Sequence, residues 1–127
     1  MSTEWPVSLA AHKSWCARVL VVDDELALAR LVARMLSPEH DVTVCTSARD
    51  ALDAIVAGSH DVVLCDLMMP DMSGMEFYEV LKVRFPEMTS RILFITGGAC
   101  NQTAQQFISA HTELVLEKPI EPYAMLG

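Results

Sequence analysis

Five side chains with complementary chemistry come directly after, or at the end of, short apolar runs. They are Asp23 and Asp24 after VLVV, Asp66 after VVLC, Thr96 at the end of ILFIT, and Lys118 after LVLE. Burying a lone carboxylate is costly, so such a residue is normally paired, metal-bound or at an accessible edge. Carboxylate oxygens are hard ligands that suit Mg²⁺, which takes few carboxylates and keeps several waters. The three aspartates are therefore candidate Mg²⁺ ligands.

The same side chains have the chemistry needed for phosphoryl transfer. An aspartate carboxylate is a nucleophile toward phosphorus once the negative charge of the incoming group is offset. A bound Mg²⁺ and the Lys118 ammonium would offset that charge, and positioning and electrostatic stabilisation are the main contributions to catalysis of this reaction. The Thr96 hydroxyl would donate to a phosphoryl oxygen after transfer. These residue types indicate transfer of a phosphoryl group to an aspartate.

The elements that must bring these residues together are strands that alternate with helices. Apolar or β-branched runs predict strands at 18–22, 41–46, 61–65, 91–96 and 113–117. Helical periodicity predicts helices over 25–37, 47–58, 73–85 and 102–110. This alternation predicts a parallel, doubly wound α/β sheet with right-handed crossovers. In such a sheet the candidate residues share the carboxyl edge of the strands, where ligands bind.

The helix boundaries and faces follow from capping residues and spacing. The first helix is predicted to bury an apolar stripe made of Leu28, Leu31, Val32, Met35 and Leu36. Arg30 and Arg34 fall on its wetter side. Ser47 is the predicted N-cap of the second helix and Gly58 its stop. The third helix is predicted to start near Ser73 and to end before Pro86. Gly74, next to Ser73, is interpreted as a loop residue.

Composition limits the class of protein. The chain has 127 residues, 52% of them apolar and 20% charged, which predicts one compact domain. With 9 Lys and Arg against 17 Asp and Glu, its net charge of −8 repels a phosphate backbone, so we expect no direct nucleic-acid binding. No apolar run approaches the ~18 to 20 residues that span a membrane, and the N-terminus lacks a signal-peptide core. We therefore expect a cytoplasmic protein without a membrane segment.

The cysteines and histidines are not expected to take part in the chemistry. Four widely separated cysteines, Cys16, Cys45, Cys65 and Cys100, show no metal-ligand or redox spacing and are interpreted as reduced thiols. Of these, Cys45 and Cys65 are expected in the core. Four histidines lie in predicted loops or tails and are expected on the surface, and not as phosphodonors. They are His12, His40, His60 and His111.

Four motifs in order, VLVVDDE, VLCDLMMPDMSG, ILFITGG and LEKP, resemble the CheY-like receiver domain of two-component response regulators. The resemblance covers residues 18 to about 122. It implies a flavodoxin-like (βα)5 three-layer sandwich with a five-stranded parallel sheet of order 2-1-3-4-5. Residues 1–17 are then an N-terminal tail or linker, and residues 18–127 the receiver domain. Only IEPYAMLG follows Pro119, so the last helix is expected to be short or truncated.

The resemblance assigns metal ligands around the phosphoacceptor. By it, Asp66 accepts the phosphoryl group, Asp24 binds Mg²⁺ directly, and Asp23 acts largely through water. The backbone carbonyl of Met68 is a further metal contact. Because the Met68 side chain is apolar and cannot orient an attacking water, we expect it to set the phosphoryl lifetime by shielding.

The remaining roles belong to the neighbouring strands. By the resemblance, Thr96 is the switch hydroxyl, Lys118 contacts the phosphoryl group, and Pro119 follows a cis peptide bond. Val115 stands where the family often has a Tyr or Phe that moves with the switch hydroxyl. The sequence therefore does not support the usual threonine–aromatic switch.

Two functions from different classes remain open at this point. The leading one is a phosphoacceptor that receives its phosphoryl group from a histidine kinase or a histidine phosphotransfer domain. The alternative is a receiver-like interaction domain that signals by binding without phosphorylation. No independent enzyme is expected beyond Mg²⁺-dependent self-phosphorylation and autodephosphorylation at Asp66. FITGGA and LVLEKPIEP are similar to receivers of hybrid histidine kinases, which favours such a parent chain, and a homodimer stays open.

Overall fold

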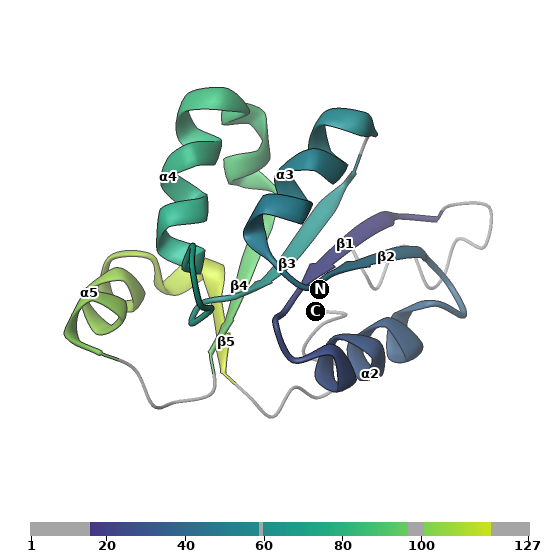
Figure 1. The fold of residues 1–127 in the computed structure, drawn as a ribbon, viewed down its shortest axis with the longest axis horizontal. Helices are drawn as coiled ribbons and strands as arrows, with labels where there is room; N and C mark the ends of the chain where they lie inside the picture. Colours follow the sequence, from purple (N-terminus) through teal and green to yellow (C-terminus); the bar gives the residue numbers. More distant parts are fainter. Residues whose placement is uncertain (1–15, 59, 97–100, 118–127) are drawn as a thin grey trace.

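Five parallel strands form one sheet in the computed structural model, which describes residues 16–58, 60–96 and 101–117 (Figure 1). Their order is β2-β1-β3-β4-β5, which confirms the predicted order. The strands are β1 (Arg18–Val22), β2 (Asp41–Cys45), β3 (Val62–Asp66), β4 (Ile92–Thr96) and β5 (Val115–Glu117). The three central strands are the apolar runs, because both of their faces are covered.

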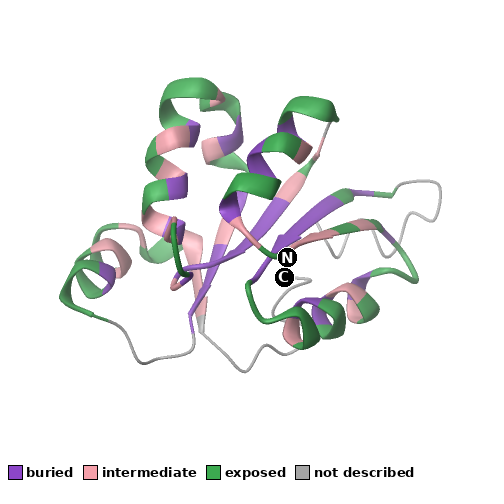
Figure 2. Ribbon diagram, in the orientation of Figure 1, coloured by how far each residue is buried: buried purple, intermediate pink, exposed green. Residues whose placement is uncertain are grey.

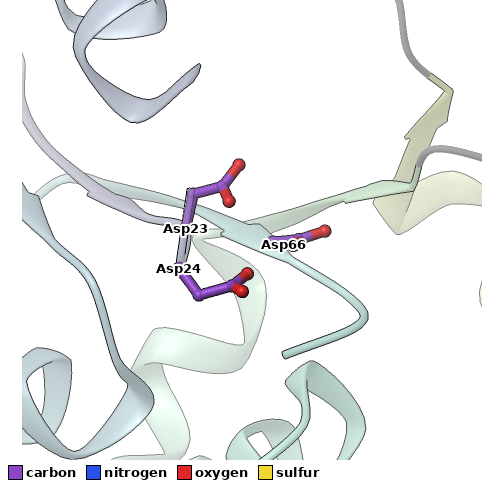
Figure 3. A group of neighbouring side chains, drawn as sticks. All are labelled: Asp23, Asp24 and Asp66. Carbon is purple, nitrogen blue, oxygen red and sulfur yellow. The ribbon is translucent and has the colours of Figure 1, made fainter. Parts of the chain in front are cut away.

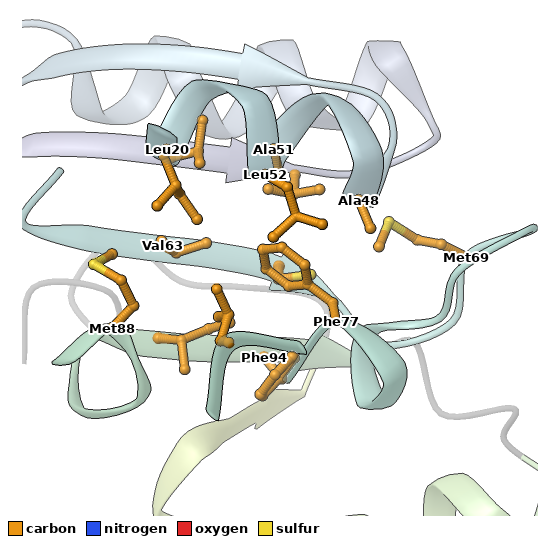
Figure 4. Packing of buried hydrophobic residues seen from close by; sticks show 14 of the residues in the cluster. Leu20, Ala48, Ala51, Leu52, Val63, Met69, Phe77, Met88 and Phe94 are labelled. Atoms are coloured by element: carbon orange, nitrogen blue, oxygen red, sulfur yellow. The ribbon is translucent and has the colours of Figure 1, made fainter. Parts of the chain in front are cut away.

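Helices cover both faces of the sheet, as expected for the flavodoxin-like arrangement (Figure 1). They are α2 (Leu26–Leu36), α3 (Ala48–Ala57), α4 (Gly74–Arg84) and α5 (Gln102–Ala110). One buried cluster joins residues of α3, α4 and α5 to the sheet, and a second joins α2 to the opposite face. The first cluster includes Leu52 of α3 and Phe77 of α4 (Figure 4). No helix in the described part of the chain is long and apolar enough to cross a lipid bilayer.

Two short 3₁₀ helices were not predicted, and the second accounts for the largest boundary difference from the sequence predictions. They are η1 (Pro86–Ser90) and η2 (Thr112–Leu114). The expected strand start at 113 is wrong, because the Leu114 N–H donates to the His111 carbonyl at 2.9 Å and closes a 3₁₀ turn there. Strand β5 therefore begins at Val115. The short or truncated last helix was expected after Pro119, which lies outside the described residues.

Side-chain caps set the start of the two helices next to β3. The Ser47 hydroxyl accepts the Asp50 N–H at 3.1 Å, which confirms Ser47 as an N-cap. At α4, the Ser73 hydroxyl accepts the Glu76 N–H at 3.2 Å, and the Glu76 carboxylate accepts the Ser73 N–H at 2.9 Å. This reciprocal capping box satisfies two helix N–H groups. It begins α4 directly after the loop that leaves Asp66.

The buried face of α2 differs from the predicted stripe at one position. Its buried residues are Ala29, Val32 and Leu36, whereas Leu31 is 48% exposed. At 100° per residue, Leu31 points about 130° away from the centre of the buried face. The prediction for Leu31 was wrong because it followed apolar bulk, while the small Ala29 is the residue that fits against the sheet. Figure 2 shows the resulting division of α2 into a buried and an exposed side.

His40 is buried, at 5% exposure, so its predicted surface position is wrong. Its Nδ1 accepts the Ala17 N–H at 3.2 Å, and the Ala17 carbonyl accepts the Asp41 N–H at 2.9 Å. Ala17 itself is fully buried. The imidazole thus ties the start of β1 to the loop before β2. Burial lowers the pKa of His40, and the nearby Glu39 carboxylate opposes that shift only in part.

Stability is expected to fall as the pH drops from 7.5 to 5.5. The folded-state pKa of His40 lies below its ordinary value of 6.5, so the unfolded chain binds the proton more tightly. The stability that neutral His40 contributes is therefore complete above pH 6.5 and is lost as the pH falls toward the folded-state pKa. Urea unfolding at several pH values measures the slope.

A matched pair of variants assigns that slope to buried His40 and half-buried His60. The pKa of His60 is also lowered, chiefly by burial and by Arg18. Asparagine places an oxygen near the position of Nδ1, so His40→Asn keeps an acceptor for Ala17 but cannot titrate. We expect His40→Asn and His60→Asn each to flatten the pH dependence. An unchanged slope in the double variant would contradict the assignment.

Candidate functional site

Strand pairing brings the predicted acidic residues to one edge of the sheet. Strands β1 and β3 are neighbours with Val22 beside Cys65, so the next residues, Asp23 and Asp66, emerge side by side. Strand β4 lies on the other side of β3 with Ile95 beside Asp66. Thr96, which ends β4, is therefore adjacent to the same edge. This is the carboxyl end of the strands, where α/β sheets place their sites.

Three carboxylates converge at that edge. One oxygen from each of Asp23, Asp24 and Asp66 lies within 4.8 Å of the others (Figure 3). Asp23 and Asp66 are only 5% and 6% exposed, while Asp24 is exposed. Ligands at about 2.0–2.1 Å from an octahedral Mg²⁺ lie about 3 to 4 Å apart, so small side-chain movements would complete such a set. The donor atoms and their spacing fit Mg²⁺.

The turn after β1 fixes the first carboxylate. The Asp23 N–H donates to the Cys45 carbonyl at 3.1 Å, which extends the pairing with β2 by one residue. The Asp23 Oδ1 accepts the Glu25 N–H at 2.9 Å, which turns the chain into α2. Asp23 therefore contributes to the turn and to the acidic cluster at the same time.

The backbone after Asp66 is held from two sides. The Leu67 N–H donates to the Ile95 carbonyl at 2.9 Å, and the Gly74 N–H donates to the Leu67 carbonyl at 2.9 Å. A Cβ atom at Gly74 would lie 2.8 Å from the Asp66 carbonyl oxygen and 2.9 Å from the Leu67 Cα. The start of α4 thus packs directly on the backbone of the candidate phosphoacceptor.

The other predicted site residues divide into described and undescribed positions. Thr96 is 2% exposed at the end of β4. Met68 is half-buried, two residues beyond Asp66, and packs against the cluster on the α3 and α4 side. Lys118 and Pro119 lie outside the described residues, so their predicted roles and the cis peptide bond remain predictions.

A comparison with protein families identifies the family to which this chain belongs. The family model described as the response regulator receiver domain matches residues 19–126. The chain belongs to this family. Receiver domains of two-component systems bind Mg²⁺ at an acidic pocket and receive a phosphoryl group from histidine kinases.

The curated relatives of this chain are longer than it is. It is 30% identical over 102 residues to the regulatory protein LuxO of Vibrio cholerae, covering 80% of this chain and 22% of that protein. It is 34% identical over 105 residues to an uncharacterised response regulatory protein of Shewanella oneidensis, covering 80% of this chain and 42% of that protein. The chain thus spans less than half the length of these relatives.

Solved receiver domains share the fold. A response regulator receiver domain protein from Clostridium thermocellum superposes with a TM-score of 0.73 at 27% identity, covering 87% of this chain and 88% of that one. The chemotaxis response regulator CheY4 of Vibrio cholerae gives a TM-score of 0.73 at 26% identity, covering 88% of this chain and 94% of that one. These similarities confirm the expected receiver fold.

Two features of this receiver site escaped the sequence reasoning. Gly74, interpreted as loop punctuation, is the first residue of α4 and lies against Asp66 and Leu67. Asp71, in the same loop, has a φ of 64°, a left-handed conformation that Asp tolerates better than most residues. A glycine directly after a capping serine was the available signal, because α4 needs no glycine for its own geometry.

Cys65 lies directly behind the site, fully buried as predicted. Its Sγ donates to the Asp66 carbonyl at 3.3 Å. Burial, and then the charges of Asp66 and Asp23, raise the pKa of this thiol well above its ordinary value. The thiol therefore stays protonated and supports the Asp66 backbone without competing as a nucleophile.

Proposed function

We propose that this receiver domain accepts a phosphoryl group on Asp66 from the phosphohistidine of a histidine kinase or a histidine phosphotransfer domain. The observation that supports this most directly is the convergence of the Asp23, Asp24 and Asp66 carboxylates within 4.8 Å, two of them nearly buried. Such a concentration of negative charge favours a bound divalent cation. The binding-only alternative gives no reason to retain this cluster and is not favoured.

The reaction requires little beyond positioning and charge. A carboxylate oxygen of Asp66 attacks the phosphorus; the new P–O bond forms as the P–N bond to the donor imidazole breaks. The bonding electron pair stays on that nitrogen, which picks up a proton. Bound Mg²⁺ would supply charge neutralisation at the phosphoryl oxygens. Asp23 and Asp24 would hold the metal, and the end of β3 holds the nucleophile in position.

The remaining roles rest on the family resemblance and the described positions. Thr96, buried beside Asp66 at the end of β4, donates its hydroxyl to a phosphoryl oxygen. The Met68 carbonyl would be a further metal ligand, and its half-buried side chain would shield the phosphorylated Asp66 from water. By the same resemblance, Lys118 would offset the charge of the phosphoryl group and Pro119 would follow a cis peptide bond. A parent hybrid histidine kinase is a further prediction, which the reading frame on either side of the chain would test.

Phosphorylation by a small phosphodonor tests the proposal. With acetyl phosphate and Mg²⁺, intact-mass spectrometry is expected to show one added phosphoryl group on the wild type and none on Asp66→Asn. Chelation of Mg²⁺ is expected to abolish the addition, because the phosphoryl charge is then not offset.

The matched control is Asp71→Asn, which changes an exposed acid in the same loop to a residue that also tolerates positive φ. It is expected to be phosphorylated like the wild type. Equal labelling of Asp66→Asn and the wild type, or no labelling of the wild type, would rule out Asp66 as phosphoacceptor.

A further inference from the structure

Half of the chain's eight methionines lie within the ten residues that follow Asp66. They are Met68, Met69, Met72 and Met75. Met69, at 9% exposure, belongs to the buried cluster that joins α3, α4 and α5 to the sheet. The other three are half-buried and pack against that cluster. We call Met68, Met72 and Met75 the outer methionines, because each combines a core contact with a solvent-exposed part.

The loop from β3 to α4 is attached to the core through methionine side chains. Backbone hydrogen bonds of Leu67 and Gly74 hold its two ends. Of residues 68–72, Pro70 and Asp71 are exposed, and the other three are methionines. Asp71 has a φ of 64°, which is unfavourable for a residue with a side chain, so the packing of its neighbours must hold it. The shape of the loop therefore depends on thioethers that stay apolar.

A thioether is an apolar group that a peroxide makes polar. A sulfur lone pair attacks the outer oxygen of the hydroperoxide, so that the S–O bond forms as the O–O bond breaks. The leaving oxygen takes a proton and departs as water or an alcohol. The sulfur is thereby oxidised by two electrons and the peroxide reduced by two. Burying the new sulfoxide oxygen without a hydrogen-bond donor is unfavourable, so the oxidised side chain is expected to leave the apolar cluster for water.

The outer methionines flank the backbone that carries the phosphoacceptor. Met72 and Met75 lie on either side of the start of α4. Between them, the Gly74 N–H donates to the Leu67 carbonyl at 2.9 Å. Gly74 also lies directly against the Asp66 carbonyl oxygen. The third outer methionine follows Leu67 in the chain. Withdrawal of these side chains from the cluster must therefore move the backbone on which the Asp66 carboxylate is mounted.

We propose that the outer methionines form an oxidation site at which a peroxide switches off phosphorylation of Asp66. The inference rests on the proposed phosphorylation of that residue. Sulfoxide formation draws the loop and the start of α4 away from the buried cluster, which displaces the Asp66 carboxylate from Asp23 and Asp24. The metal ligand set is then incomplete, and the phosphoryl charge is no longer offset. Because methionine sulfoxide can be reduced enzymatically, the loss is reversible.

Phosphorylation of the full chain after mild oxidation tests the proposal. The protein is treated with hydrogen peroxide and then with dithiothreitol, which reduces disulfides and sulfenic acids but leaves sulfoxides. Intact-mass spectrometry compares its labelling by acetyl phosphate and Mg²⁺ with that of the untreated protein, and peptide mass spectrometry locates the sulfoxides. We expect the outer methionines to be oxidised before Met88, which is only 4% exposed. Labelling is expected to fall at least fivefold once all three are oxidised.

Leucine variants assign the effect to the three sulfurs. Leucine has nearly the volume of methionine and no sulfur, so the exchange largely preserves packing. A triple variant with Met68→Leu, Met72→Leu and Met75→Leu is expected to lose less than half of its own untreated labelling after the same treatment. Met35→Leu is the matched control, because Met35 is also half-buried but packs against the cluster on the opposite face of the sheet. It is expected to lose labelling as the wild type does.

Enzymatic repair provides a second measurement, which also serves if the triple variant fails to fold. The oxidised wild type is treated with two methionine sulfoxide reductases, one for each sulfoxide epimer. Labelling is expected to return as the sulfoxides of the outer methionines disappear. Labelling that stays lost after these sulfoxides are reduced would overturn the oxidation site.

The outcomes separate this proposal from the proposed function. Absence of labelling in the untreated wild type would overturn phosphorylation of Asp66. A labelled wild type whose labelling survives oxidation of the outer methionines would overturn the oxidation site alone. So would a triple variant that loses labelling as far as the wild type does, or outer methionines that are oxidised no faster than Met88.

Discussion

Replacing Gly74 with alanine is expected to destabilise the domain by about 1 to 3 kcal/mol, the usual cost of forcing an extra group into packed structure. The added Cβ would lie 2.8 Å from the Asp66 carbonyl oxygen and 2.9 Å from the Leu67 Cα, and both are backbone atoms. Helix propensity alone would favour alanine over glycine by about 1 kcal/mol. The clash outweighs that gain because α4 is tied to Leu67 by a 2.9 Å hydrogen bond and cannot simply withdraw.

The same substitution is expected to weaken Mg²⁺ binding at least tenfold. To relieve the contact, the backbone of Asp66 and Leu67 must shift, and a displaced carboxylate no longer completes the ligand set. Urea unfolding and Mg²⁺ titration followed by NMR measure the two effects. Gly58→Ala is the control, because a Cβ there meets only the Ala54 carbonyl oxygen at 3.7 Å and the His60 ring at 3.8 Å. Equal stability of the two variants would refute a positioning role for Gly74.

The sheet order and the acidic edge could be predicted because each depends on strong local signals. The strands β1, β3 and β4 are nearly continuous apolar runs, and parallel strands necessarily present their carboxyl ends at one edge. Asp23 and Asp66 then fall side by side by register alone. The family resemblance added the assignment of roles among these residues. That assignment did not follow from spacing.

Features that depend on contacts with residues distant in the sequence could not be predicted from the sequence. His40 has a loop sequence around it, and only the Ala17 N–H, 23 residues earlier, makes it a buried acceptor. Leu31 has the bulk of a core residue, but the sheet in front of α2 accepts Ala29 instead. Likewise, the glycine after Ser73 signals a close approach, but the local sequence does not show that the Asp66 backbone is what approaches it. In each case the deciding contact comes from another element.

Replacing Asp23 with asparagine is expected to stabilise the metal-free domain by about 1 to 3 kcal/mol. Two unit charges about 5 Å apart repel by about 3 kcal/mol at an effective dielectric constant of 20, and the asparagine removes one charge from the cluster. Its Oδ1 can still accept the Glu25 N–H, so the turn after β1 is kept. The same change is expected to lower Mg²⁺ affinity at least tenfold, because one ligand charge is lost.

Asp23→Asn raises the stability of the metal-free domain but weakens Mg²⁺ binding. The order of stability of the variant and the wild type must therefore reverse as the Mg²⁺ concentration rises. A cation that binds only the folded state stabilises it in proportion to the logarithm of its concentration above the dissociation constant. Without Mg²⁺, the thermal unfolding midpoint of Asp23→Asn is expected to lie above that of the wild type. As Mg²⁺ is added, the difference between the two midpoints is expected to shrink and then to change sign. Asp53→Asn, an exposed acid on α3, is expected to follow the wild type throughout. Parallel curves for Asp23→Asn and the wild type would mean that Asp23 neither repels its neighbours nor binds the metal, since a structural role alone produces no crossing.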